Sequence, residues 1–454
     1  NASSTGTGRG LRAGRSRGVW ETRAPQDGIT LTCGRYSEYD SGGKPVAYQA
    51  FLLSPDKALA DRYLDATGGY IDLYASLIGP YPYGKFALVE NFWETGYGLP
   101  SFTLLGSKVL RLPFIINSSY PHEILHNWWG NGVFVDYNKG NWCEGLTAYL
   151  ADYLIAENRG KGGEYRMTTL QKYSDYVRGG ADFPLTAFRS RHSSASEAVG
   201  YGKSLMFYHM LRGLLGDENF RSGLRSFYAA NKFRTSGFSD LRAAFEKTTG
   251  AGRLAGFFSQ WTERTGAPEL ALKQAKVTRG NDGYDLEFTL AQVQEGPAYE
   301  LQIPAAIYLE GFGEPRMKLL PMKEKEETYH YNVPLRPSRL EIDPQFDLFR
   351  KLSPLETPPT LSRLLGAAAP ALVLPAGPAG EPWRPLAAAW QKDPANLPSV
   401  VDDKADAPPA GASYWLLGGE NRLAPAFEAG LEAYGAVFTT AAVTIDNRVF
   451  PRAG

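Results

Sequence analysis

Three residues within five positions have the types and the spacing that a catalytic metal site requires. His122 and His126 are four residues apart in the sequence His-Glu-Ile-Leu-His. On a helix, residues at this spacing lie on one face, so both imidazoles can bind the same ion. Glu123, beside the first histidine, can then reach a water molecule at that ion. The chemistry that this pattern predicts is metal-assisted hydrolysis.

One further residue completes a set of metal ligands. Glu144 follows His126 with seventeen residues between them, at the start of the helical stretch WCEGLTAYLADYL. Two histidines from one helix and a glutamate from the next are the ligands of many catalytic zinc sites, which leave a fourth position for water. We therefore predict that His122, His126 and Glu144 bind one Zn²⁺ ion.

Two helices must position these side chains. Residues 119–129 are predicted to form the first, with Ser118 or Ser119 as its amino-terminal cap and Gly130 at its end. Residues 142–158 are predicted to form the second, because apolar residues recur there at helical spacing. Cys143 has no second cysteine at metal-binding spacing and is expected to be a small buried residue.

The helical pattern continues on both sides of this pair. Other predicted helices are 58–79, 164–178, 197–215, 217–231, 238–248 and 253–264, and strand-like pieces lie at 85–92 and 101–115. Three other histidines lie away from the motif. We expect His192 to be solvated, His209 to be packed or hydrogen-bonded on a helix, and His330 to lie on a strand.

The character of the sequence changes before and after this helical region. Residues 28–53 alternate apolar and polar positions and read as the remainder of an amino-terminal β domain. Short alternating segments over 269–348 predict a β-sandwich, and residues 370–454 suggest a βαβ-type unit. The expected organisation is a disordered start with a β remnant (1–55), a catalytic domain (56–268), a β-sandwich (269–352), a linker (353–368) and a partial α/β unit (369–454).

Composition excludes several other classes of protein. The 454 residues include 48 Lys plus Arg and 48 Asp plus Glu, so bulk charge does not favour a nucleic-acid partner. No apolar run approaches the roughly 20 residues of a membrane-spanning helix. The chain starts with Asn1 and without a signal-peptide pattern, and we expect it to be part of a longer protein. Compartment and oligomeric state do not follow from the sequence.

The stretch HEILHNWWGNGVFVDYNKGNWCEGLTAYLADY resembles the zinc-binding core of the aminopeptidase N family of zinc metallopeptidases, the gluzincins. In that family eighteen residues separate HExxH from the Glu of an Asn-Glu-Gly, whereas this chain has seventeen and Cys143-Glu144-Gly145. The resemblance covers about residues 75–350. It implies a multidomain α+β protein with a mainly α-helical, thermolysin-like catalytic domain, followed by a β-sandwich and a partial α/β unit.

A second landmark of the family is a Tyr-Glu-Lys-Gly sequence whose tyrosine supports the oxyanion. Tyr201-Gly202-Lys203-Ser204 keeps the tyrosine and the lysine and departs at the other two positions. The resemblance thus implies that Glu123 is the general base and that Tyr201 is the oxyanion donor. It also implies a peptide substrate with a free amino terminus.

The third family landmark, Gly-x-Met-Glu-Asn, is altered here, and its glutamate binds the substrate's α-amine in the family. The corresponding region reads WETGYGLPSFTLLG, in which Glu94 could serve as the amine anchor. The backbone near Gly96 and Gly98 could also bind an extended peptide as an added strand. The expected activity is therefore that of an aminopeptidase. The alternatives are a zinc endopeptidase or other zinc hydrolase on the same fold, and a non-catalytic binding scaffold.

Overall fold

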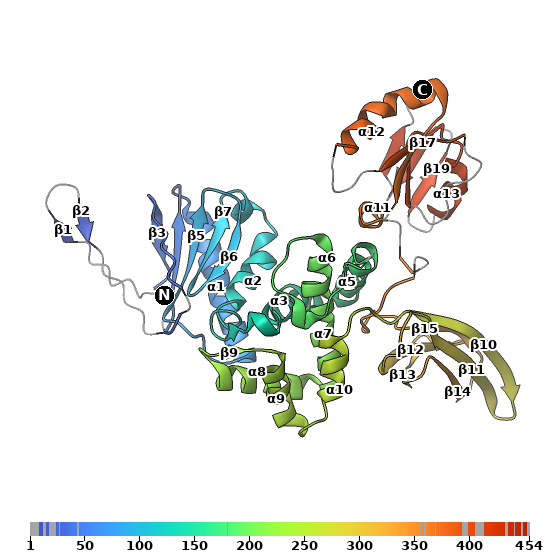
Figure 1. Ribbon diagram of the computed structural model, residues 1–454, viewed down its shortest axis with the longest axis horizontal. Coiled ribbons are helices and arrows are strands. Elements are labelled where there is room, and N and C mark those ends of the chain that lie inside the picture. Colours follow the sequence, from blue (N-terminus) through green and yellow to red (C-terminus); the bar gives the residue numbers. More distant parts are fainter. Residues whose placement is uncertain are drawn as a thin grey trace. The chain divides into compact units, whose positions relative to one another are not determined.

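The computed structural model shows a mixed α+β protein (Figure 1). The structure describes residues 9–11, 15–17, 24–26, 28–42, 45–178, 180–353, 356–357, 360–367, 369–392, 398–404, 413–431, 435–439, 441–445 and 448–451. The chain divides into two compact units, Asn1–Leu170 with Asp182–Arg350, and Gln171–Ala181 with Lys351–Gly454. None of the described helices has the length and apolar character needed to cross a lipid bilayer.

A five-stranded sheet in the order β3-β4-β5-β7-β6 lies next to the motif helices in the first unit (Figure 1). Its strands are β3 (Ser37–Asp40), β4 (Ala47–Leu52), β5 (Lys85–Asn91), β6 (Gly96–Leu99) and β7 (Phe102–Gly106). The central strands are parallel, and the outer pairs β3/β4 and β6/β7 are antiparallel. β6 is an edge strand.

The sheet includes two strands that the sequence analysis placed in a separate amino-terminal domain. β3 and β4 pair with each other, and β4 hydrogen-bonds along β5, with Ala50 opposite Leu88. Alternation of apolar and polar residues predicts strands but carries no information about their partners. Of residues 1–18, the structure describes only β1 (Arg9–Leu11) and β2 (Arg15–Arg17), so most of the expected disordered start lies outside the described residues.

Helix α1 (Lys57–Leu77) connects β4 to β5 and confirms the helix predicted at 58–79. The Asp56 carboxylate caps its first turn by accepting from the Leu59 N–H at 2.9 Å. Tyr63 and Tyr74 on its buried face pack on Tyr120 and Trp128 of the motif region. Hydrophobic burial therefore ties the sheet, α1 and the motif helix into one core.

The remaining helical part of this unit contains several short turns. Its elements are η1 (Val109–Arg111), η2 (Ile115–Asn117), α2 (Ser119–Leu125), η3 (Tyr137–Lys139), α3 (Cys143–Ala148), the π-turn η4 (Tyr149–Tyr153), α4 (Leu154–Asn158), the first part of α5 (Gly162–Tyr176), η5 (Leu185–Ala187), α6 (Ser194–Glu197), the π-turn η6 (Ala198–Lys203), α7 (Ser204–Leu215), α8 (Asp217–Asn231), α9 (Phe238–Thr249), α10 (Ala255–Phe258) and the π-turn η7 (Ser259–Glu263). From Gln171 on, α5 belongs to the second unit. β8 (Phe134–Val135) and β9 (Thr235–Ser236) form a short parallel pair.

Two of these elements differ from the prediction. The strand-like stretch 101–115 is a strand only as far as Gly106 and continues as the 3₁₀ turns η1 and η2. The helix predicted at 119–129 ends at Leu125, and Gly130 adopts a positive φ of 95° after one more turn. The Ser118 hydroxyl makes no capping bond to the helix and donates instead to the Phe114 carbonyl.

Residues 270–342 form two three-stranded antiparallel sheets, in the orders β10-β11-β14 and β13-β12-β15. The strands are β10 (Leu270–Gly280), β11 (Gly283–Gln292), β12 (Leu301–Leu309), β13 (Arg316–Met322), β14 (Glu326–Val333) and β15 (Pro337–Ile342). All six lie within the stretch where the sequence predicted short strands.

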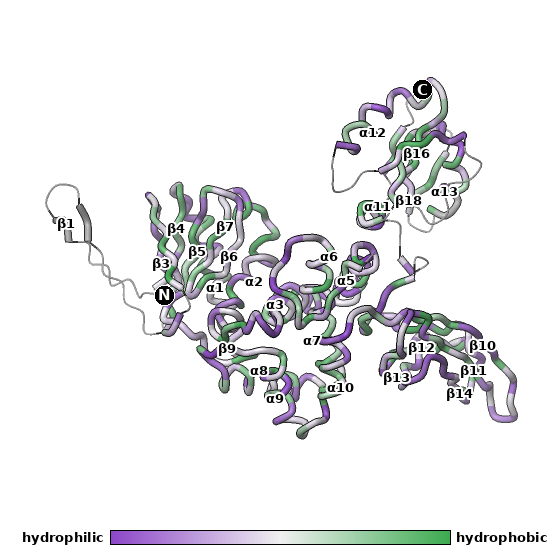
Figure 2. The backbone as a smooth tube through the Cα atoms, in the orientation of Figure 1, coloured by the Kyte–Doolittle hydropathy of each residue, from purple (hydrophilic) through white to green (hydrophobic). Residues whose placement is uncertain are grey.

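The second unit contains a parallel sheet with the order β17-β16-β18. Its central strand, β16, is hydrophobic along its length (Figure 2). Its elements are α11 (Leu361–Leu365), β16 (Pro370–Leu374), η8 (Gly377–Trp383), α12 (Arg384–Trp390), β17 (Ser399–Asp402), β18 (Ser413–Leu416), α13 (Ala424–Leu431), β19 (Ala436–Phe438), β20 (Ala442–Ile445) and β21 (Arg448–Pro451). α11 lies within the segment expected to be a linker.

Candidate active site

The motif histidines lie on and at the end of helix α2. Its residues Tyr120, Ile124 and Leu125 are fully buried, so His122 and His126 are left on the partly exposed face. The centres of the two imidazole rings are 4.9 Å apart. His126 caps the carboxyl end of the helix, and one helical turn is enough to hold both rings on the same side.

Glu144 approaches the histidines from the first turn of α3. The Asn141 side chain accepts from the backbone N–H groups of Cys143 and Glu144 at 3.1 and 3.4 Å and so caps this helix. A Cβ on Gly145 would overlap the Ser204 side chain at the start of α7. Only glycine permits the two helices to cross this closely, and the crossing determines where Glu144 lies.

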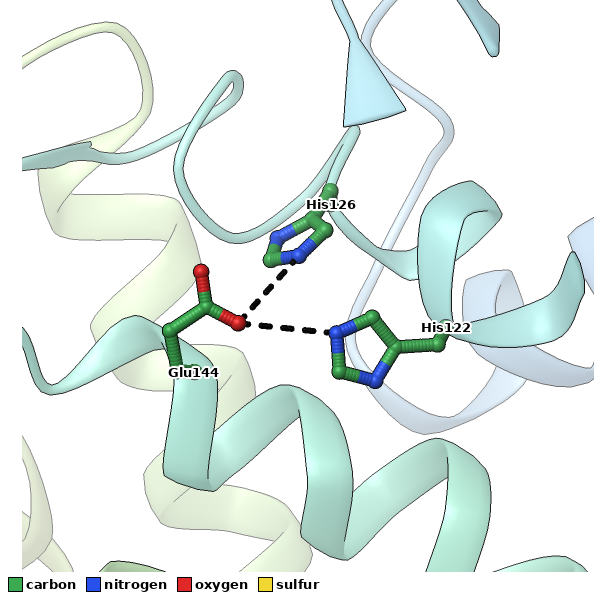
Figure 3. A group of neighbouring side chains, drawn as sticks. All are labelled: His122, His126 and Glu144. Atoms are coloured by element: carbon green, nitrogen blue, oxygen red, sulfur yellow. Dashed lines mark ion pairs between the residues drawn. The ribbon is translucent and has the colours of Figure 1, made fainter. Parts of the chain in front are cut away.

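The three predicted ligands converge on one point (Figure 3). Oε2 of Glu144 lies 3.5 Å from Nε2 of His122 and 3.6 Å from Nε2 of His126. One donor atom from each of the three side chains lies within 4.8 Å of the other two. Although burial opposes it, the two histidines lower the pKa of Glu144 to about 2, so the carboxylate is ionised. Two imidazole nitrogens and one carboxylate are a donor set that fits a zinc ion.

Each histidine is oriented by the partner of its other ring nitrogen. Nδ1 of His122 lies 2.9 Å from Oδ2 of Asp152, and Nδ1 of His126 lies 3.2 Å from the carbonyl oxygen of Trp129. When Nδ1 donates to these partners, the Nε2 lone pair of each ring is left for a metal ion. The Cys143 sulfur is also 3.5 Å from Nδ1 of His126, and Cys143 is buried as expected.

Asp152 belongs to the candidate site through its contact with His122, and the sequence reasoning missed it. It lies in η4, eight residues after Glu144. On a regular α-helix an offset of seven residues would face the same side as Glu144. The π-turn η4 inserts one extra residue, so an offset of eight residues brings Asp152 to the same side as Glu144. The sequence shows a carboxylate about two helical turns after Glu144. The direction in which that side chain points depends on the π-turn, which hydrophobic periodicity does not reveal.

Glu123 lies beside His122 and His126, with its carboxylate facing the edge strand β6. Burial raises the pKa of Glu123, while His126 and His122 oppose the increase. A Cβ placed on Gly98 would lie 2.8 Å from Oε2 of Glu123, and one on Gly96 would lie 3.1 Å from Oε1. A carboxylate with a raised pKa, held between the strand and the histidines, is suited to accept and return a proton.

Tyr201 lies beside His122 and Glu144, in the π-turn η6. Its ring is nearly parallel to that of His122, with centres 6.5 Å apart and an interplanar angle of 17°. Its hydroxyl is within hydrogen-bonding range of the Glu144 carboxylate. Burial and the Glu144 charge raise the pKa of Tyr201, so the phenol keeps its proton and remains a donor.

Glu94, the candidate amine anchor, lies in the turn between β5 and β6. Its two carboxylate oxygens accept from the backbone N–H groups of Lys108 and Val109, at 3.2 and 3.1 Å. These contacts join the turn to the start of η1.

The remaining histidines lie apart from this cluster. His209 is largely buried on α7, and its Nε2 is 2.9 Å from Asp347. His192 is exposed, with Nδ1 at 3.2 Å from the Ser190 carbonyl. His330 is exposed on β14, at 3.5 Å from Glu287. The sequence predicted a solvated His192, a packed His209 and a His330 on a strand, and the three environments agree with this.

Residues 116–261 match the peptidase family M1 domain. The chain is 26% identical over 220 residues to alanine/arginine aminopeptidase of Saccharomyces cerevisiae, a match that covers 43% of this chain and 25% of that protein. It is 25% identical over 263 residues to aminopeptidase RNPEPL1 of Homo sapiens, covering 53% and 36%, respectively. It is 24% identical over 156 residues to aminopeptidase N of Lactococcus lactis subsp. lactis, covering 32% and 18%. The matches thus span 18% to 36% of the length of these curated relatives.

Proposed function

Because the chain belongs to the aminopeptidase N family of zinc metallopeptidases, we propose that it is a zinc-dependent peptidase that releases amino-terminal residues from peptides. The observation that carries this proposal is the convergence of His122, His126 and Glu144 within 4.8 Å, with Glu123 beside them. We further propose that residues 56–268 form a thermolysin-like catalytic domain, that 269–352 form a β-sandwich, and that 369–454 form a partial α/β unit.

His122, His126 and Glu144 would hold a single Zn²⁺ ion. When bound, this ion supplies Lewis acidity toward the scissile carbonyl and toward the attacking water. Asp152 keeps His122 in the tautomer that presents Nε2 to the ion. Both partners of this contact belong to the folded chain, so the tautomer of His122 does not depend on the metal ion.

Glu123 would act as general base and then as general acid. Its carboxylate takes a proton from the attacking water and passes it to the nitrogen of the leaving peptide. The raised pKa of Glu123 brings its protonated and ionised forms closer in free energy, which helps the second transfer.

Tyr201 would stabilise the negative charge that develops on the carbonyl oxygen. Its hydroxyl keeps its proton, because burial raises the pKa of Tyr201. In the absence of substrate this hydroxyl lies near Glu144, and we propose that it donates to the substrate oxygen during the reaction.

The test is peptide hydrolysis by the wild-type protein and by Glu123→Gln, with zinc content measured on both samples. We expect bound zinc in both proteins and a turnover about 10²–10⁴-fold lower in the variant, since only the proton acceptor has been removed. Loss of zinc from wild-type protein by chelation should abolish turnover, and added zinc should restore it. Turnover by Glu123→Gln at the wild-type rate would refute the assigned base.

A further inference from the structure

Two groups of the candidate site lie on π-turns rather than on regular helix. Asp152, which orients His122, belongs to η4, and Tyr201 belongs to η6. A π-turn interrupts the regular hydrogen-bond pattern of a helix, and the direction of its side chains depends on the extra residue. The position of these side chains therefore depends on the elements that pack on the two turns.

The side chain of Arg166, on helix α5, holds the first of these turns. Arg166 is buried, and its Nη1 donates to the hydroxyl of Tyr153, the residue that follows Asp152 in η4. The guanidinium carbon lies 5.5 Å from the centre of the Tyr153 ring. The same hydroxyl donates to Oε1 of Glu157 at 2.7 Å, so its proton and one lone pair are both engaged. These contacts fix the end of η4 next to Asp152.

Arg166 is in turn held by residues 343–350, the segment that follows β15. Its Nε and Nη2 donate to the carbonyl oxygen of Gln345 at 3.1 and 2.8 Å, and Nε also lies 3.2 Å from the carbonyl oxygen of Phe346. Nη2 is 2.9 Å from Oδ1 of Asp347. A planar guanidinium presents several donors in fixed directions and suits this set of acceptors, which one ammonium group could not match.

The segment that follows β15 has internal support of its own. The buried carboxylate of Asp343 accepts from the Asp347 N–H at 2.7 Å and pairs with Arg350 at 2.9 Å. The Asp343 N–H donates to the Pro304 carbonyl of β12 at 2.6 Å. Asp343 and Phe346 adopt positive φ values of 52° and 56°, a conformation that is unfavourable for residues other than glycine. The surrounding contacts therefore impose one conformation on this segment and connect it to the sheet β13-β12-β15.

The same segment also contacts the turn that carries Tyr201. The Lys203 ammonium of η6 lies 5.7 Å from the centre of the Phe349 ring. The Phe349 N–H donates to the sulfur of Met210 on α7 at 3.3 Å. Residues 343–350 thus contact η6 directly and η4 through Arg166.

We propose that Arg166 is a positioning residue, which together with residues 343–350 holds η4 so that Asp152 orients His122 for the metal. This inference rests on the proposed function, because it assumes a zinc ion at the site. In the described part of the chain Arg166 binds Tyr153 and residues 345–347 and none of the three predicted ligands, so its influence on the metal passes through η4. Loosening η4 should therefore weaken zinc binding by the same route as removal of the Asp152 carboxylate.

The experiment is a double-mutant cycle on zinc affinity, measured on the full chain by competition with a chelator. It compares the wild-type protein, Arg166→Met, Asp152→Ala and the double variant. We expect Arg166→Met to weaken zinc binding about 3–10-fold, and to cause no further loss in the Asp152→Ala background, where the contact that it supports is already gone. Wild-type affinity in Arg166→Met would overturn the proposal. The same loss in both backgrounds would also overturn it, because a structural effect that does not pass through Asp152 is additive.

Tyr153→Phe provides a second test that keeps the buried guanidinium and removes only one hydroxyl. It should weaken zinc binding about 2–5-fold and should also have no additional effect in Asp152→Ala, whereas unchanged affinity would contradict the proposal. The matched control is Arg264→Met, since Arg264 also lies over a tyrosine ring and donates to two backbone carbonyls, those of Pro297 and Ala298. Zinc affinity should stay at the wild-type level in this control, and an equal loss there would refute a specific role of Arg166.

Peptide hydrolysis, assayed on the same zinc-loaded samples, separates this inference from the proposed function. If zinc affinity follows the expected pattern and no peptide is cleaved, the proposed peptidase function fails and Arg166 keeps its positioning role at the metal. Absence of zinc binding by the wild-type protein would overturn both.

Discussion

Nδ1 of His122 lies 2.9 Å from Oδ2 of Asp152, although the two residues are thirty positions apart in the chain. This contact joins α2, which carries the motif, to the π-turn η4 that follows the third predicted ligand. It orients the His122 ring before any metal binds, and the ligand set is therefore largely preorganised.

Asp152→Ala should weaken zinc binding by about 10–100-fold, because His122 loses the acceptor that holds its ring and tautomer. Asp152→Asn should have a smaller effect, since its amide oxygen can still accept from Nδ1. Zinc affinity measured by competition with a chelator checks this order, with the exposed Asp72→Ala as a control. Equal affinities of the wild-type protein and Asp152→Ala would show that the contact has no influence on the metal.

Tyr201→Phe should reduce kcat by about 10²–10³-fold and leave zinc content unchanged, because the hydroxyl is the proposed oxyanion donor and is not a metal ligand. Steady-state kinetics on one peptide, with metal analysis of the same sample, provides the measurement. The exposed Tyr137→Phe is the matched control. Wild-type kcat in Tyr201→Phe would remove this residue from the mechanism.

Gly145→Ala should destabilise the fold by roughly 1–3 kcal/mol and weaken zinc binding, since its Cβ would overlap the Ser204 side chain and push α3 away from α7. Adding Ser204→Gly removes the colliding atoms and should recover part of both losses, whereas adding Ser204→Ala keeps the Cβ and should recover less. Urea unfolding and chelator competition on wild type, on Gly145→Ala, Ser204→Gly and Ser204→Ala alone, and on the two double variants measure this coupling. Additive effects in the Gly145→Ala/Ser204→Gly protein would show that the helix crossing is not the cause.

Lys203 should make folding stability depend on pH above neutrality. Burial lowers the pKa of Lys203 to about 8, while its ammonium donates to the carbonyl oxygens of Arg264 and Gly266. Between about pH 8 and the unfolded value of about 10.4, the unfolded chain holds the proton that the folded chain has lost. The unfolding free energy should therefore rise with pH in this window, by up to about 1.4 kcal/mol per pH unit. Below the window Lys203 is protonated in both states, so its pH dependence disappears and its destabilising contribution stays constant.

Unfolding of wild-type protein and Lys203→Met between pH 7 and 9.5 isolates this effect, and the exposed Lys57→Met is the control. The difference in unfolding free energy between wild type and Lys203→Met should change with pH, while the difference for Lys57→Met should stay constant. Parallel pH profiles for all three proteins would contradict the assignment.

Local pattern was sufficient to find the motif, to predict which side chains come together and to predict most helices and strands. His122, His126 and Glu144 were predicted from residue type and spacing, and the structure brings them together. Glu123 and Tyr201, assigned on the motif and on a resemblance, lie beside them, and their roles stay predictions.

Tertiary contacts decided the rest. The sequence could not place β3 and β4 in the same sheet as β5, because strand pairing is a long-range property. It could not reveal Asp152, whose direction depends on the extra residue of a π-turn. Nor could it show that Gly96 and Gly98 face Glu123, since that follows from how the edge strand crosses the motif helix. Periodicity along a chain determines which face of an element is buried, whereas packing between distant elements determines what that face meets.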